Sequence, residues 1–406
     1  MSPGVEWSLG KRLAFRFGVI AAALYVYPLP FGVIPYTDSI AEALGKPWQW
    51  LVVWFSESVL GAGTPPIQPT GSGDTLFSWV SFLVLVLVSA LGAAVWSALD
   101  RRRLAYPRLA SATWIGLRYL LAFTLFSYGF AKLVNTQFPA PSPAQLDERV
   151  GEMSPMGLLW TFQGASTAYT FFGGLAEAVA GTLLLWRRTA TLGALLAMAV
   201  MTNVVMLNFC YDVPVKLYSM QLLAIAALIA LPQLRRLLRA SLGHAVGEVP
   251  PRPRSSQRRE RARIVAKLGA IALLGYSIYS NVHAASEYVR PASELQGVWK
   301  VETWTEHGRP AKARWRKLIV TEWAAVVVDD DGQQNWVRAE VIPGLQLLVV
   351  QTRQYDLWQY ARPEPGRMII DRVEGGTDLR ITLSREPEPL LVTRGFHWIQ
   401  EFPFNR

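Results

Sequence analysis

Seven apolar stretches, each near the length of a membrane-spanning helix, constrain this chain more than any other feature. A bilayer core about 30 Å thick requires about 20 apolar residues in a helix. The chain of 406 residues is 51% hydrophobic, with a mean hydropathy of +0.21, which indicates an α-helical polytopic membrane protein. The predicted spans are 13–34, 77–99, 114–134, 166–186, 191–209, 215–232 and 267–285.

Basic residues lie in alternate connections between these stretches. They precede the first span, follow the second, separate the fourth from the fifth and are densest in 233–267, whereas 35–76 and 136–165 contain few. Because positively charged loops stay in the cytoplasm, we expect a multi-pass protein of the cytoplasmic (inner) membrane with a cytoplasmic N-terminus and an extracytoplasmic C-terminal domain. This distribution accounts for the net charge of +10 without nucleic acid, so the lipid bilayer is the expected partner.

The N-terminal region contains two further helical signals. The first span follows basic residues, as a signal peptide would, but it contains Pro28, Pro30 and Pro35 and lacks a small-residue cleavage site, so we expect a retained helix. Residues 38–60, with three tryptophans, predict an amphipathic helix at the outer membrane interface. A re-entrant hairpin is the alternative for 38–60.

Residue types that hold metals or cofactors are scarce in this sequence. Cys210 is the single cysteine and the four histidines lack partners at metal-ligand spacing, so we expect no disulfide, no metal site and no bis-histidine haem. The GSGDT of loop 61–75 lacks the Lys-Ser/Thr of a phosphate-binding loop. Basic residues in 249–263 are interpreted as a topology signal, with an anionic ligand as the alternative.

From residue 290 to 406 the pattern changes to short segments of alternating polarity divided by Gly- and Asp-rich turns. About eight strands in this length predict an all-β, up-and-down small barrel, which leaves no free sheet edge. Gly297-Val298-Trp299 resembles the G-x-W start of lipocalin-like barrels. Such a barrel holds an apolar ligand or is filled by its own side chains. The segments are 297–304, 314–323, 324–329, 335–342, 345–350, 355–360, 366–371, 378–384 and 389–400.

Polar residues of the third predicted span fall on one helical face. Arg118, Tyr128 and Lys132 recur with Leu121 and Leu125 at steps of three and four, which places all five on one stripe. A polar stripe on a membrane helix is expected to face other helices rather than lipid. The alternative for Arg118 and Lys132 is that each extends to the lipid headgroups at its end of the span.

The fourth predicted span carries Glu177 near the middle of the membrane, where an unpaired carboxylate is costly. Gly174 and Gly181 lie on the same face and allow another helix to approach closely. We therefore expect Lys132 to reach inward and pair with Glu177, with Arg118 beneath the pair. The alternative is a neutral Glu177 that forms hydrogen bonds between helices.

Four residues of the fifth span and the following turn complete the predicted polar site. Asn203 and Asn208 are expected to form hydrogen bonds between helices, and Asp212 and Lys216 lie at the outer turn. No catalytic residue is assigned. The predicted bundle site is Arg118, Tyr128, Lys132, Glu177, Asn203, Asn208, Asp212 and Lys216.

The residues of the central spans resemble those of the DoxX-like integral membrane proteins. The resemblance rests on Arg118, on YGFAKL (128–133), on Glu177 and on the small residues that follow it. In that family an Arg, a G-x-x-K and a Glu recur over a four-helix bundle. SPMGLLWTF (154–162) and LNFCYDVPVKL (207–217) resemble a longer branch with extra spans and an external β domain. The family includes small subunits of quinone-linked thiosulfate oxidoreductases, so the resemblance implies a quinone as a candidate cofactor.

Two functions remain after these observations. The favoured one is a binding or assembly component that holds a lipid-soluble ligand, or a membrane or periplasmic partner protein. The alternative is the membrane component of a quinone-linked oxidoreductase, which the missing redox ligands disfavour, so enzyme activity is left open. A transporter is disfavoured because no internal repeat is visible.

The predicted regions are 1–112 with two spans, the DoxX-like four-helix bundle 113–233, the basic cytoplasmic loop 234–266, the seventh span 267–289 and the β domain 290–406.

Overall fold

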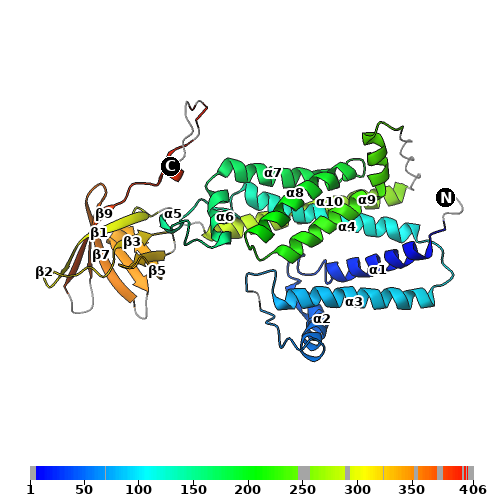
Figure 1. Ribbon diagram of the computed structural model, residues 1–406, viewed down its shortest axis with the longest axis horizontal. Coiled ribbons are helices and arrows are strands. Elements are labelled where there is room, and N and C mark those ends of the chain that lie inside the picture. The colour runs from blue at the N-terminus through cyan, green and yellow to red at the C-terminus, as the bar shows by residue number, and fades with distance from the viewer. Residues whose placement is uncertain are drawn as a thin grey trace. The chain divides into compact units, whose positions relative to one another are not determined.

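The computed structural model describes residues 6–68, 70–245, 257–288, 293–322, 324–351, 355–372, 378–395, 397–398 and 400. The chain forms two compact units, one of helices and one built on a β-barrel (Figure 1). The first unit comprises Met1–Gln137 and Phe171–His283, and the second comprises Phe138–Thr170 and Ala284–Arg406. Residues 249–256 of the basic stretch singled out above lie outside the described part of the chain.

Helices occupy all seven positions at which the sequence predicts a span. Four of the described helical segments are long and apolar enough to cross a membrane: α3, α4, α8 and the Lys216–Leu234 part of α9. The structure thus confirms a mostly helical protein with candidate membrane spans, while the number seven stays a prediction. The helices of this unit are α1 (Leu9–Val26), α2 (Asp38–Ser58), α3 (Leu76–Leu99), α4 (Pro107–Leu133), α7 (Thr167–Leu184), α8 (Ala190–Cys210), α9 (Lys216–Ser241) and α10 (Gln257–Tyr288).

The surface of α3 has the polarity expected of a lipid-facing helix. Leu83, Leu87, Leu91 and Val95 are spaced by four residues and are 39–67% exposed. An exposed stripe of this kind would be unfavourable in water and is typical of a helix against acyl chains. Other parts of the α3 surface pack against α1 and α2 (Figure 1).

Helix α1 ends at Val26, eight residues before the predicted end of the first span at residue 34. Pro28 and Pro30 cause the difference, because proline lacks a backbone N–H and disfavours helical geometry in the residue before it. Helix α2 confirms the predicted helix at 38–60, and the Trp48 indole donates a hydrogen bond to Ser81 Oγ at 2.8 Å. Its interfacial location stays a prediction.

Arg16, which the sequence reading treats only as a topology signal, joins α1 to α3. Its side chain is 2% exposed, and its guanidinium donates to Ser97 Oγ and the Asp100 carbonyl at 2.7 Å and to the Tyr106 hydroxyl at 2.8 Å. Tyr106 in turn donates to Asp100 Oδ2. A buried cation satisfied in this way stabilises the pairing of the two helices.

The second unit contains a closed antiparallel barrel of eight strands, as the sequence predicts. β1 pairs with β3, each strand from β3 to β8 pairs with the next, and β9 pairs with β1, which closes the sheet; the two-residue β2 pairs with the end of β1. The buried Trp299 of the G-x-W segment donates its indole N–H to the Leu295 carbonyl at 2.7 Å. The strands are β1 (Gly297–Glu306), β2 (Arg309–Pro310), β3 (Lys317–Val320), β4 (Ala324–Val328), β5 (Gln334–Ile342), β6 (Leu347–Gln351), β7 (Tyr355–Glu364), β8 (Arg367–Arg372) and β9 (Leu379–Arg385).

One predicted strand is wrong. Within 389–400 the structure has a single helical turn, α11 (Leu390–Thr393), which begins after Pro389. The β1–β9 pairing explains the difference, because a closed barrel offers no free edge to which a further strand could add.

The connection between α4 and α7 packs on the barrel, which sequence periodicity does not reveal. It contains α5 (Pro143–Asp147) and α6 (Pro155–Gly164), and Ala144 is buried against Ile319 and its neighbours. Lys317 donates to Asp147 at 2.6 Å and to Glu386 at 3.0 Å. Burial alone would lower the pKa of Lys317, but these two carboxylates outweigh it and raise the pKa above its usual value. The charged lysine therefore fastens α5 to the barrel.

Candidate functional site

Glycines on α4 and α7 bring the backbones of the two helices into contact. A methyl carbon at Gly174 would lie 2.6 Å from the Gly129 carbonyl oxygen, and one at Gly129 would lie 2.9 Å from the Gly174 carbonyl oxygen. These distances leave no space for any side chain. The close approach determines which residues of the two helices meet.

Lys132 and Glu177 meet beside this contact. The Lys132 ammonium donates to both carboxylate oxygens of Glu177 at 2.8 Å, and the two side chains are only 13% and 4% exposed. Both charges are therefore compensated inside the bundle. Lys132 therefore pairs with Glu177, as the helical stripes predict. It does not have the alternative conformation, in which its side chain extends to the lipid headgroups.

Three tyrosines from different helices lie around this pair. The Lys132 ammonium is 5.8 Å from the ring centroid of Tyr128, which lies 6.3 Å from the ring of Tyr218 on α9. Tyr25 of α1 packs, like Tyr218, against the apolar core of the helical unit, and its buried hydroxyl has no hydrogen-bond partner among the described residues. We call these five residues the Lys132 site. Sequence reasoning missed Tyr25 and Tyr218, because a tyrosine within an apolar run resembles ordinary packing.

Arg118 does not join the Lys132 site. Its guanidinium lies 5.2 Å from the Trp114 ring and 5.3 Å from the Tyr119 ring, and in the described part of the chain it makes no ion pair with Glu177. Arg118 and Glu177 lie at different heights of the bundle, since Glu177 contacts Lys132, which is about four turns from Arg118 on α4. Arg118 lies about four helical turns before Lys132 on α4, as the stripe predicts, and its inclusion in one polar site with the pair stays a prediction.

The two asparagines of α8, Asn203 and Asn208, differ in burial and in hydrogen bonding. Asn208 is buried and donates to Ser219 Oγ at 3.0 Å on α9, which confirms its predicted role between helices. Asn203 is exposed and makes no hydrogen bond within the described residues, so the same prediction is wrong for it. The i, i+5 spacing explains the contrast, because it places the two side chains on different faces of α8.

Asp212 and Lys216 belong to the N-terminal cap of α9. Lys216 Nζ lies 2.7 Å from Asp212 Oδ1, and the Asp74 carboxylate accepts hydrogen bonds from the backbone N–H groups of Lys216 and Leu217 at 2.8 and 2.9 Å. A carboxylate at a helix N-terminus satisfies free N–H groups and favours the helix dipole. Asp74 belongs to the GSGDT loop. This loop therefore caps the N-terminus of α9, which is a structural role.

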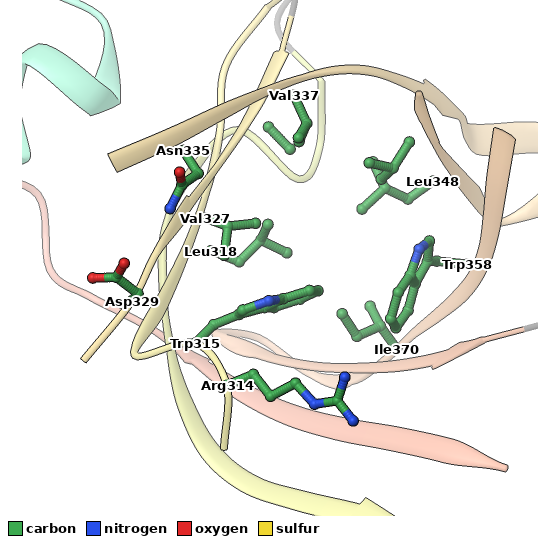
Figure 2. Close-up of a pocket in the computed structure, with 12 residues that line it drawn as sticks. Arg314, Trp315, Leu318, Val327, Asp329, Asn335, Val337, Leu348, Trp358 and Ile370 are labelled. Atoms are coloured by element: carbon green, nitrogen blue, oxygen red, sulfur yellow. The ribbon is translucent and has the colours of Figure 1, made fainter. Parts of the chain in front are cut away.

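The barrel encloses an apolar cavity of about 360 Å³. Trp315 and Trp358 face the same space as Leu348, Val337 and Ile370, as Figure 2 shows. The indoles of Trp304, Trp315 and Trp358 are in successive contact, with centroids 5.2 and 5.6 Å apart. Polar groups at the cavity are few: Arg314, Asp329 and Asn335. Buried side chains such as Trp299 and Met368 fill part of the barrel, and the pocket lies beside them, so both alternatives are met in part.

A second cavity of about 470 Å³ is more polar, and Glu294, Glu322 and Glu340 lie among its lining residues. Tyr360 donates a hydrogen bond to Glu294 at 2.5 Å. Burial and this contact raise the pKa of Tyr360 to about 12, so its proton stays in place at physiological pH. Within the described residues, no group of three His, Cys, Asp or Glu side chains could hold a metal ion.

Comparison with known proteins assigns no activity. No family model matches the chain, and no solved structure matches it. The chain is 40% identical over 99 residues to an uncharacterized protein, YwoB, of Bacillus subtilis (strain 168). That match covers 24% of this chain and 62% of the relative, so the chain spans less than two thirds of the relative's length.

Proposed function

We propose that this chain is a DoxX-like integral membrane protein that binds a lipid-soluble ligand in its β-barrel. The observation that carries the proposal is the apolar cavity of about 360 Å³. Its volume falls within the range of about 300–1,000 Å³ for small-molecule pockets, which are mostly apolar with a few polar groups. An acyl chain or an aromatic ring system matches the tryptophan and aliphatic lining, and the Arg314–Glu306 ion pair at the edge of the cavity favours a polar end group.

A quinone-linked oxidoreductase component is the second candidate. The observation that favours it is the Tyr25 hydroxyl of the Lys132 site, which is buried without an acceptor among the described residues. A buried donor of this kind gains stability from an acceptor such as a quinone carbonyl. Lys132 and Glu177 would then supply charge and protons beside the ring. A quinone that co-purifies with the full chain in mild detergent would favour this function over the first.

Filling the barrel cavity tests the first function. We expect Leu348→Trp to lower labelling of barrel peptides by a photoreactive fatty acid about tenfold, which corresponds to about 1.4 kcal/mol of binding energy. Leu348 is 1% exposed and lines the cavity, so the larger indole would occupy the ligand's space. The measurement uses the full chain in lipid nanodiscs and mass spectrometry of labelled peptides, with the labelling of the helices as the internal standard.

The matched control for this test is Leu345→Trp, the same substitution at a side chain that is 63% exposed. We expect it to leave barrel labelling unchanged. Equal labelling of the two variants, with both folded by circular dichroism, would mean that the cavity is not the binding site.

The barrel is expected on the extracytoplasmic side of the cytoplasmic membrane, because basic residues are concentrated in alternate loops. Alkaline phosphatase is active only outside the cytoplasm, so a fusion after Arg406 should be active and one near Ser255 inactive. Green fluorescent protein at the same two positions should give the opposite pattern. Reversed activities would place the barrel in the cytoplasm and exclude a periplasmic ligand.

A further inference from the structure

Near the middle of α4, away from the Lys132 site, lies a buried cation that forms no ion pair within the described residues: Arg118. Arg118 is 6% exposed, and its Nε atom is buried with no hydrogen-bond partner in the described residues. The aromatic rings of Trp114 and Tyr119, 5.2 and 5.3 Å from the guanidinium carbon, contact it but do not neutralise it. Cation–π contacts contribute only about 0.5–2 kcal/mol.

Two further cations lie near this guanidinium. Arg187 of the α7–α8 turn and Lys267 of α10 both interact electrostatically with Arg118. The Lys267 ammonium is 4.2 Å from the ring of Trp186. No carboxylate of the described residues forms an ion pair with Arg118, Arg187 or Lys267. We call these three residues the Arg118 cluster.

Three convergent cations with one of them buried are unfavourable in the absence of an anion. A buried charge without a partner is costly inside a membrane protein, and like charges add repulsion. A phosphate group compensates the buried charge and the repulsion, because it is negatively charged and its oxygens accept two parallel hydrogen bonds from a guanidinium. Trp114 and Trp186 flank the cluster, and tryptophan is enriched at the level of lipid headgroups.

We propose that the Arg118 cluster binds the phosphate group of an anionic phospholipid. Arg118 supplies the buried donor, Lys267 and Arg187 supply charge from the neighbouring helix and turn, and the tryptophans contact the glycerol and upper acyl chain. This site is separate from the barrel cavity, and it gives Arg118 a role of its own, apart from the Lys132–Glu177 pair.

Lipid binding by the purified full chain tests the proposal. After delipidation in detergent, we expect native mass spectrometry to show tight retention of one phosphatidylglycerol and no comparable retention of phosphatidylcholine. Arg118→Gln should weaken retention of phosphatidylglycerol about tenfold, as expected for loss of a charged hydrogen bond. Lys267→Gln, at the more accessible edge of the cluster, should weaken it about fivefold without affecting the fold.

Arg108→Gln is the matched control, since Arg108 is an exposed arginine in the first turn of the same helix. It should leave the retained lipid in place. Equal losses in the Arg108, Arg118 and Lys267 variants would indicate general surface attraction and overturn the site. A second experiment compares how much inorganic phosphate and phosphatidylglycerol raise the melting temperature of the full chain. An equal rise would mean that the site binds free phosphate and that the lipid assignment is wrong.

Discussion

We expect Glu177→Gln and Lys132→Met each to lower the thermal stability of the full chain strongly, and the double variant to lose less than the sum of the two. Either single replacement leaves one buried charge without its partner, which costs about 3–5 kcal/mol in soluble proteins. The double variant removes both charges, so the coupling appears as non-additivity. The measurement is thermal unfolding in detergent of the wild type, the two single variants and the double variant. Its structural basis is the distance of 2.8 Å from the Lys132 ammonium to each carboxylate oxygen of Glu177.

An exposed pair of the same residue types provides the control cycle. Lys46 and Glu42 on α2 lie 3.8 Å apart and are 68% and 71% exposed. Exposed pairs contribute about 0–1 kcal/mol, so Lys46→Met and Glu42→Gln should be nearly additive and nearly neutral. Strict additivity in the Lys132–Glu177 cycle as well would mean that the buried pair does not interact, and Lys132 would then extend to the headgroups.

Gly174→Ala is expected to destabilise the protein by several times more than Gly173→Ala. The new methyl carbon at Gly174 would lie 2.6 Å from the Gly129 carbonyl oxygen and 2.8 Å from Lys132 Cβ, so α4 and α7 must separate. Overpacking of a rigid core costs about 1–3 kcal/mol or more, and the separation would also weaken the Lys132–Glu177 pair.

Gly173→Ala makes a sharp comparison because the two glycines are adjacent on α7. The nearest atom to its new methyl carbon is Lys132 Cδ at 3.9 Å, an ordinary van der Waals contact. Alanine is favoured over glycine in a helix by about 1 kcal/mol, so this variant should be neutral or more stable. Similar melting temperatures for the two variants would contradict backbone contact between α4 and α7.

The Lys132–Glu177 pair shows how far a helical stripe can be read from sequence. The 3.6-residue period places Lys132 at one end of the α4 stripe and Glu177 beside the glycines of α7, so the face of each residue follows from spacing alone. The same reasoning put Arg118 on this stripe, about four turns before Lys132, but it did not reveal that the neighbours of Arg118 there are Trp114 and Tyr119. A stripe runs the length of the helix, and the depth of each contact depends on where the partner helices lie.

Local periodicity thus determined the positions of the helices and the order of the strands, because helix and strand periods are properties of a few neighbouring residues. Only the tertiary structure decided which distant residues meet. Tyr25 and Tyr218 around Lys132, and the Asp74 cap on α9, depend on packing between elements far apart in the chain. The β1–β9 closure likewise leaves a pocket beside a packed core, because strand number and side-chain volume together set the space inside.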